Sequence, residues 1–125
     1  MTYYLTSGDV VAIAEEIGAG GALRDFGLLD AAIGRPQASM FGADAYPDVG
    51  TKAAALMHSI IANPPFVDGN KRTGLTAGLA FLELNRVGAV EIDQDAAYEL
   101  TINVASHKIS DVEEIAAALR LIVGG

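Results

Sequence analysis

The sequence predicts an all-α domain of about six helices, and three observations support this class. Apolar residues recur at helical spacing along almost the whole chain. Hydrophobic types make up 51% of the 125 residues and charged types 19%, which excludes a disordered chain. The length suits one domain, which we place over residues 1–125. We therefore expect a single compact domain built around one central buried helix.

Two helices are predicted in the first third of the chain. Apolar residues at helical spacing define the first over residues 10–17, and the glycines at positions 18, 20 and 21 end it. The second is expected over residues 28–33. It ends at Arg35-Pro36, because proline cannot continue a helix. Residues 37–47 are predicted to form a loop.

The third and fourth helices are expected to form the core. The third begins at Val49 and stops before Pro64, and the fourth runs from about residue 70 to residue 85. Residues 75–84 are apolar on almost every side of the helix, which predicts that the fourth helix is the central, buried one. Gly74 and Gly78 are expected to let neighbouring helices approach it closely.

The last part of the chain predicts a short extended piece and two helices. The extended piece is expected over residues 89–92. Asp93 is a suitable N-cap for the fifth helix. The segment from Ser110 to Glu113 has the pattern of a capping box for the sixth.

Composition and charge exclude several classes of protein. The chain has 8 Lys and Arg against 16 Asp and Glu, a net charge of −8, so a broad nucleic-acid-binding surface is not expected. The absence of cysteine excludes disulfides and thiolate zinc sites and fits a reducing cytoplasm, where we expect the protein. We expect neither a signal peptide nor a membrane span.

The segment between the third and fourth helices carries the strongest indication of function. Gly69 permits a tight turn, and Lys71 and Arg72 place two cations at the start of the fourth helix. A phosphate bound there would interact with the helix start and neutralise both cations. Asp68 is a suitable Mg²⁺ ligand beside phosphates. The alternative is an ordinary helix–helix turn capped by Asn70, with both cations solvated.

This segment resembles the core motif of the Fic/Doc family, His-x-Phe-x-Asp-(Gly/Ala)-Asn-(Gly/Lys)-Arg. The matching residues, in order, are Phe66, Asp68, Gly69, Asn70, Lys71 and Arg72. Residues 23–37, 81–85 and 105–110 are also similar to segments of that family. Lys71, where Fic enzymes have glycine, and Leu75, where they have a second arginine, are typical of the Doc branch.

The resemblance implies a Fic fold, a reaction and partners. Doc-type relatives are toxins that transfer a phosphate from ATP to a threonine of elongation factor Tu and so halt translation. Fic relatives transfer AMP to a hydroxyl instead. A small antitoxin holds such toxins by placing a helix in an apolar groove.

The resemblance also implies a role for each matched residue. Phe66 would anchor the loop in the core, and Asp68 would hold Mg²⁺ and help to activate the acceptor hydroxyl. The phosphates would be cradled by Gly69, Asn70 and Lys71. Arg72 would stabilise charge on the group that is transferred.

One position departs from the motif, because Pro64 occupies the place of the histidine that would act as general base. His58 is expected to be a partly buried structural residue, and His107 is expected to be solvated. Either the chain is a natural inactive relative, or Pro64 is an inactivating change acquired when a toxic gene was cloned. We prefer the second, because every other motif position is intact.

Two further segments have predicted roles. Asp25 is expected to cap the second helix, with Arg24 solvated beside it. By resemblance, residues 37–48 correspond to a flap that docks the target protein. Phe41 and Tyr46 would either serve that contact or lie in the core.

Overall fold

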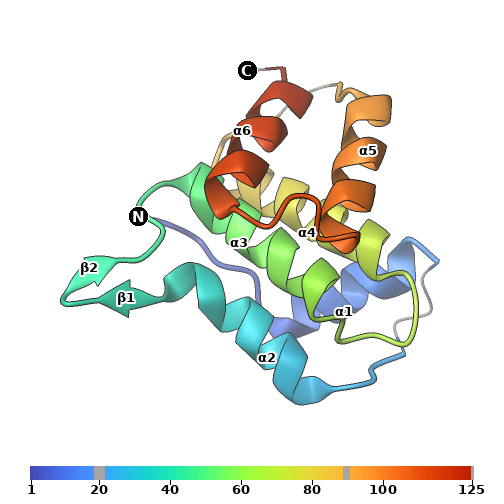
Figure 1. The fold of residues 1–125 in the computed structure, drawn as a ribbon. Coiled ribbons are helices and arrows are strands. Elements are labelled where there is room, and N and C mark those ends of the chain that lie inside the picture. The colour runs from blue at the N-terminus through green and yellow to red at the C-terminus, as the bar shows by residue number, and fades with distance from the viewer. Residues whose placement is uncertain (19–21, 89–90, 125) are drawn as a thin grey trace.

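Six α-helices make up most of the described chain, in agreement with the predicted class. The computed structural model describes residues 1–18, 22–88 and 91–124 (Figure 1). A short 3₁₀-helix, η1 (Arg35–Gln37), and two short strands, β1 (Ser39–Met40) and β2 (Ala43–Asp44), lie between the second and third helices. The α-helices are α1 (Ser7–Glu16), α2 (Phe26–Gly34), α3 (Val49–Ala62), α4 (Asn70–Leu84), α5 (Gln94–Ala105) and α6 (Val112–Ile122).

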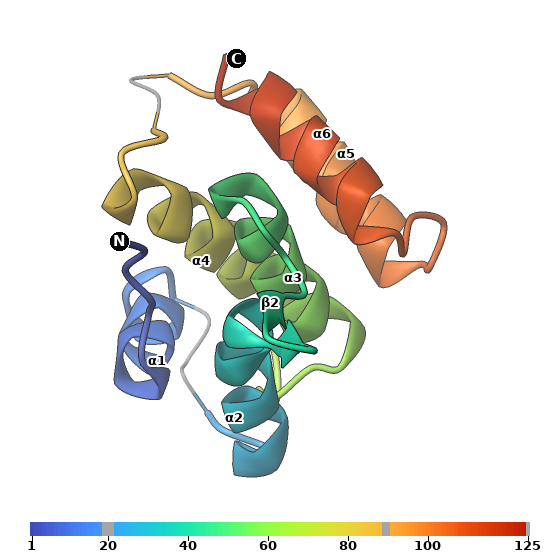
Figure 2. The ribbon, with the colours of Figure 1, turned by 90° about the vertical axis from the view of Figure 1, so that its left-hand side faces the viewer.

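The helices form three layers, with α3 and α4 in the middle. Helices α5 and α6 form an adjacent pair on one side, and α1 and α2 lie on the other (Figures 1 and 2). The central buried helix is α3, which contacts α2, η1, α4, α5 and α6. Helix α4 shares the middle layer with α3, but the prediction that it would be buried on almost every side was wrong. Helix α4 buries one face only, because α5 and α1 leave its Lys71, Glu83 and Leu84 exposed.

Gly74 and Gly78 of α4 both face α3, and Gly74 sets how closely the two helices approach. A Cβ atom on Gly74 would lie 2.6 Å from Cγ1 of Ile61, and one on Gly78 would lie 3.4 Å from Cβ of Met57. Real Cβ atoms do not approach other carbon atoms to 2.6 Å, so the α3–α4 distance depends on the missing side chain of Gly74. This contact places the start of α4 beside the end of α3.

The predicted helix ends are confirmed in most cases. Gly18, with a φ of 77°, follows the end of α1, and the Asp93 carboxylate accepts from the Ala96 amide at the start of α5. The capping box predicted from Ser110 is wrong, because Asp111 is the N-cap of α6 and accepts from the Glu113 amide. Helix α2 begins two residues before the predicted residue 28. Of the predicted extended stretch, residues 89–90 lie outside the described residues, and 91–92 form no strand.

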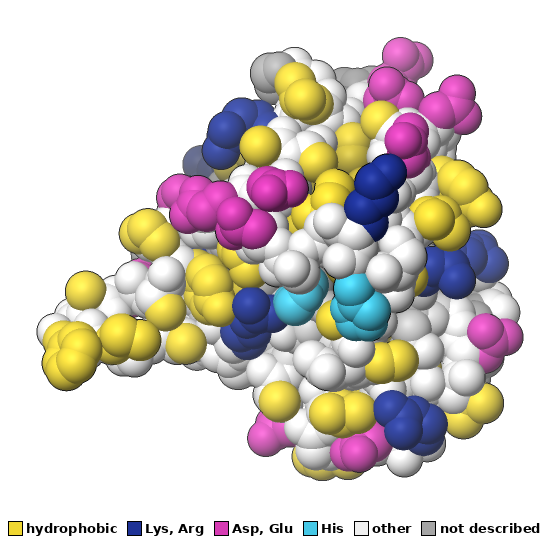
Figure 3. All heavy atoms as spheres, in the orientation of Figure 1, with side chains coloured by type: hydrophobic (Ala, Val, Ile, Leu, Met, Phe, Trp, Pro, Cys, Tyr) yellow, Lys and Arg dark blue, Asp and Glu magenta, His cyan; other side chains and the backbone are white. Residues whose placement is uncertain are grey.

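The segment 37–47 is not the simple loop that was predicted. Ser39 pairs with Asp44 and Met40 with Ala43 in an antiparallel hairpin. The two turn residues, Phe41 and Gly42, have φ values of 52° and 81°, as a tight two-residue hairpin turn requires. The hairpin projects from the body beside the N-terminal end of α3, and hydrophobic side chains gather at its tip (Figures 1 and 3).

None of the described helices combines the length and the apolar character needed to cross a membrane.

Candidate functional site

The predicted site residues gather around one cavity at the start of α4. The cavity has a volume of about 410 Å³ and lies between the end of α3, the loop after it and the end of α5. Its lining residues are Ile61, Pro64, Val67, Asp68, Gly69, Asn70, Lys71, Arg72 and Ala105. Phe66 does not line this cavity. Its side chain is 1% exposed and belongs to the core, as expected of an anchor.

Main-chain hydrogen bonds from residues 22–25 hold the loop that carries the motif. The amides of Arg24 and Asp25 both donate to the carbonyl of Pro65, at 2.7 and 3.0 Å. The Val67 amide donates to the carbonyl of Ala22 at 2.9 Å. These bonds fix the backbone on both sides of Phe66.

Arg24 is exposed, as predicted, and it also takes part in this support. Its guanidinium donates to the carbonyl oxygen of Pro64. Asp25 caps α2, as predicted, because its carboxylate accepts from the Leu28 amide at 3.0 Å. The sequence offered no signal for the Arg24 contact, because its acceptor is a backbone carbonyl 40 residues away.

Asn70 closes the loop. It is not the N-cap of α4, as the alternative of an ordinary helix–helix turn had predicted. The N-cap of α4 is Gly69, whose φ of 75° lies in the left-handed region that favours glycine. The Asn70 Oδ1 atom accepts from the Phe66 amide, and its Nδ2 atom donates to the Phe66 carbonyl, both at 3.0 Å. The side chain therefore bridges the ends of a five-residue loop.

The first turn of α4 provides amides and cations at the cavity. The first helical hydrogen bond runs from the Thr73 amide to the Gly69 carbonyl at 2.9 Å, so the amides of residues 70–72 precede the helical ladder. The side chains of Lys71 and Arg72 are exposed beside them. Unpaired helix amides, the positive end of the helix dipole and two cations together form a suitable site for a phosphate chain.

Asp68 is the single carboxylate among the described lining residues of this cavity. Its Oδ1 atom accepts from the Gly69 amide at 2.8 Å. Within residues 1–18, 22–88 and 91–124, no group of three or more His, Asp or Glu side chains lies close enough to hold a metal without other ligands. One carboxylate beside a phosphate site fits Mg²⁺, because this ion takes one or two carboxylates and completes its shell with phosphate oxygens and water.

Neither histidine of the chain lines the cavity in place of Pro64. His58 lies in α3, half-buried, and its Nδ1 atom accepts from Nη1 of Arg35 at 2.7 Å. Burial, the Arg35 charge and the neighbouring His107 lower the pKa of His58 below its usual value of 6.5. His58 is therefore a neutral structural residue, as expected, and the exposed His107 lies in the turn after α5.

A second cavity of about 320 Å³ lies between the end of α1, α4 and α5. Its lining is mainly apolar, and Arg72 borders it as well as the first cavity. The lining residues are Ile17, Arg72, Leu75, Thr76, Gln94, Ala97, Tyr98 and Thr101.

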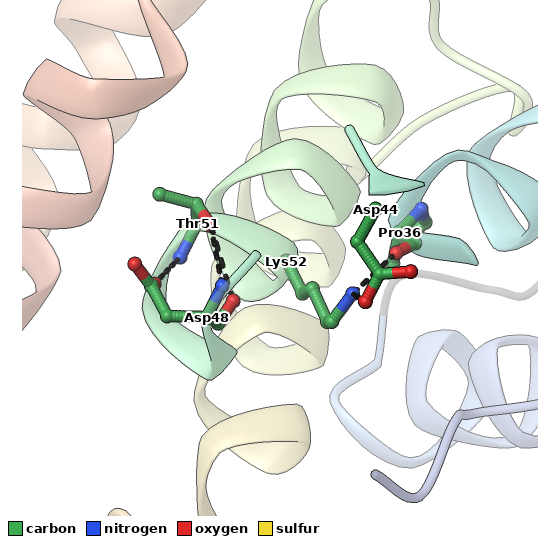
Figure 4. Close-up of polar contacts among 5 residues, drawn as sticks. All are labelled: Pro36, Asp44, Asp48, Thr51 and Lys52. Carbon is green, nitrogen blue, oxygen red and sulfur yellow. Dashed lines mark hydrogen bonds and ion pairs between the residues drawn. The ribbon is translucent and has the colours of Figure 1, made fainter. Parts of the chain in front are cut away.

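Two buried or half-buried cations beside the hairpin were missed by the sequence analysis. Lys52 is 2% exposed, and its ammonium contacts Asp44 and the Pro36 carbonyl (Figure 4). Arg35 donates to the Tyr46 hydroxyl at 2.8 Å, so Tyr46 lies against the body whereas Phe41 is fully exposed. Lys52 was recognisable, because it shares a helical face with the apolar positions 56 and 60.

The chain has an all-α fold in which the buried α3 leads, through a loop that contains Gly69, to the cationic start of α4, and these features define a domain of the Fic type. The chain belongs to the Fic/DOC family, whose model matches residues 4–82. It is also 48% identical over 122 residues to the protein called Toxin Doc of Mycolicibacterium smegmatis (strain ATCC 700084 / mc(2)155). That likeness covers 95% of this chain and 92% of the relative, so it extends well beyond the motif.

Proposed function

We propose that this chain is the toxin of a toxin–antitoxin module whose site is built to transfer a phosphate from ATP to a hydroxyl of a translation factor. We propose further that Pro64 impairs the reaction in this chain. The observation that carries the proposal is the shared cavity, which brings Asp68, Lys71 and Arg72 together at the amides that begin α4. The likeness to Toxin Doc supports the toxin class.

The residues present account for most of what phosphoryl transfer requires. The amides of residues 70–72, together with Lys71 and Arg72, would bind the phosphates and neutralise the charge that spreads over the transferred group. Asp68 would hold Mg²⁺, which would supply positive charge beside the phosphates. The acceptor oxygen forms a bond to the terminal phosphorus as the bond to the leaving ADP oxygen breaks. The acceptor hydroxyl must also lose its proton, and Pro64 supplies no group that can take it.

Two other functions are distinguished by their products. An AMP transferase of the Fic type would leave AMP on the target, and Lys71 disfavours it because its side chain narrows the phosphate path that glycine leaves open. A non-catalytic binding module would leave the target unmodified. Mass spectrometry of elongation factor Tu, as the expected target, separates the three outcomes by the mass added to the protein.

The decisive experiment replaces Pro64 by histidine. The Pro64→His variant should arrest growth when it is expressed without antitoxin, and phosphothreonine should form on elongation factor Tu. General-base catalysis contributes on the order of a hundred- to ten-thousand-fold, which is enough to separate a harmless chain from a toxic one. Pro64→Ala is the matched control, because it removes the proline ring without supplying a base. A Pro64→His variant that folds normally, modifies nothing and harms no cell would refute the kinase proposal.

We also propose that the second cavity receives a helix of the antitoxin. The cavity lies between α4 and α5, and apolar side chains such as Leu75, Ala97 and Tyr98 line it. An amphipathic helix binds such a groove through its apolar face. A pull-down with the product of the neighbouring reading frame tests this partner, and failure to form a complex at micromolar concentration would contradict it.

A further inference from the structure

The main chain between the end of α3 and the buried Phe66 contains two consecutive prolines. Proline has no amide hydrogen, so Pro64 and Pro65 offer only their carbonyl oxygens for main-chain hydrogen bonds. The helical hydrogen bonds of α3 end at the residue before Pro64. The next amide, that of Phe66, donates to Oδ1 of Asn70. Any hydrogen bond that fixes the main chain of the two prolines must therefore act on their carbonyls.

Arg24 reaches both of these carbonyls. Its amide donates to the Pro65 carbonyl at 2.7 Å, and its guanidinium donates to the Pro64 carbonyl. The Asp25 amide adds a second bond to the Pro65 carbonyl at 3.0 Å. Among the described residues, Pro64 forms no other hydrogen bond. The main chain at position 64 is therefore held by the side chain of Arg24.

Position 64 faces the cavity that contains the motif. Pro64 lines this cavity together with Asp68, Lys71 and Arg72, so a side chain at position 64 shares it with the carboxylate and both cations. Arg24 is not among the described residues that line the cavity. Its side chain is exposed, and within the described part of the chain it forms no ion pair. The connection between Arg24 and the cavity is therefore its bond to residue 64.

We propose that Arg24 is a positioning residue for the group at position 64: by holding the carbonyl oxygen of this residue, it directs the side chain at that position toward the acceptor hydroxyl. This inference rests on the proposed function. A base takes the hydroxyl proton only within hydrogen-bond distance, so a small rotation of the main chain at position 64 moves the base out of reach. Misplacement of a reacting group by about 1 Å costs on the order of a hundredfold in rate.

The bond from Arg24 can be measured in the chain as it exists. The ¹³C chemical shift of the Pro64 carbonyl carbon responds to hydrogen bonding at its oxygen, and Arg24→Ala should change it. Arg24 is exposed, so this variant loses no core packing, and its Asp25 amide should stay protected from hydrogen exchange. Arg86→Ala removes an exposed cation just beyond the other end of α4 and should change neither signal. An unchanged Pro64 carbonyl shift in Arg24→Ala would overturn the inference.

The same changes made in the Pro64→His variant test the positioning role. Arg24→Ala should lower kcat for phosphate transfer to elongation factor Tu by about tenfold to a hundredfold and leave the KM for ATP unchanged. Arg24→Lys should recover most of kcat, because the lysine ammonium can also donate to a carbonyl. A general loss of stability would not lower kcat alone.

The outcomes separate this inference from the proposed function. An active Pro64→His variant whose kcat does not respond to Arg24→Ala would overturn the positioning role and leave the proposed function intact. A Pro64→His variant that folds normally and transfers nothing would refute the proposed function, and the inference with it.

Discussion

Lys71 and Arg72 are exposed cations at a helix start, a position that the helix dipole disfavours for positive charge. Their presence is understandable if a phosphate chain binds between them. At the same residue scale, the neighbouring Asn70 has a different task, because both ends of its amide bind the backbone of Phe66. Under the proposed function, Lys71 and Arg72 bind the phosphates, and the adjacent Asn70 shapes the loop that presents them.

The first prediction concerns these cations. Replacing both Lys71 and Arg72 by alanine should lower the affinity for ATP by tenfold or more, because each charge-assisted hydrogen bond contributes about 1.5–3 kcal/mol. Isothermal titration at two salt concentrations measures the effect, and the salt dependence of binding should weaken in the double variant. Arg86→Ala removes an exposed cation just beyond the other end of α4 and should change neither quantity. Equal ATP affinity in all three proteins would mean that the loop is only a turn.

A second prediction concerns His58 and pH. Its pKa is lowered in the folded chain, mainly by burial and then by Arg35, so the unfolded chain binds the proton more readily. Stability should therefore decrease as the pH falls through 6.5 and level off once the lower folded pKa has been passed. His58→Gln stays neutral throughout and should reduce this slope. Urea unfolding between pH 7.5 and 5 checks it, and an identical slope in both proteins would contradict the prediction.

At the scale of elements, the contact between α3 and α4 depends on a single missing methyl group. Gly74→Ala should destabilise the fold by about 1–3 kcal/mol, because the new Cβ atom overlaps Ile61 in a packed interface. Gly34→Ala is the matched control. Nothing lies within 4 Å of a Cβ at that position in α2, so alanine should be neutral or stabilising by up to about 1 kcal/mol. Thermal unfolding of both variants measures the difference, and equal shifts would show that the approach of the two helices is not tight.

The elements also show what the sequence could predict. Each helix was recognisable from apolar spacing and end signals, because these are local properties. The relative burial of the two middle helices was not, because residues 75–84 of α4 are apolar on almost every side and yet part of this helix is exposed, whereas α3 is buried in spite of Lys52. Its burial depends on Asp44 and Pro36, which reach it only in the folded chain. The hairpin was missed because its four strand residues are all exposed and carry no alternating pattern.

At the scale of the whole molecule, the site was easier to predict than the body that supports it. The motif places Asp68, Gly69 and Arg72 within five consecutive residues, so their proximity required no knowledge of the fold. The support from residues 22–25 joins segments that are 40 or more residues apart, and it consists largely of bonds between backbone atoms, which have no sequence signature. Arg72 lines both cavities, and this could not be predicted either, because both cavities depend on how α5 packs against α4.

The whole molecule should become more stable when the antitoxin binds. A ligand that binds only the folded chain adds about 2.7 kcal/mol at a concentration one hundred times its Kd, so the unfolding temperature should rise with the concentration of antitoxin. Leu75→Asp places a charge in the apolar cavity and should abolish the rise, whereas Asp30→Asn should preserve it. Differential scanning fluorimetry provides the measurement. A rise that survives Leu75→Asp would place the antitoxin elsewhere on the surface.

The bridge from Asn70 to Phe66 has a consequence for the protein inside a cell. Under the proposed function, Pro64 leaves the chain without a general base, so it should be expressed without killing its host and the amount of each variant that accumulates can be measured directly. Substitutions at position 70 remove the two hydrogen bonds that close the loop around the buried Phe66, so they should make the chain more susceptible to proteases. Substitutions at position 71 should leave these hydrogen bonds and the fold intact. The cellular abundance of the protein should therefore fall when Asn70 is replaced and stay unchanged when Lys71 is replaced.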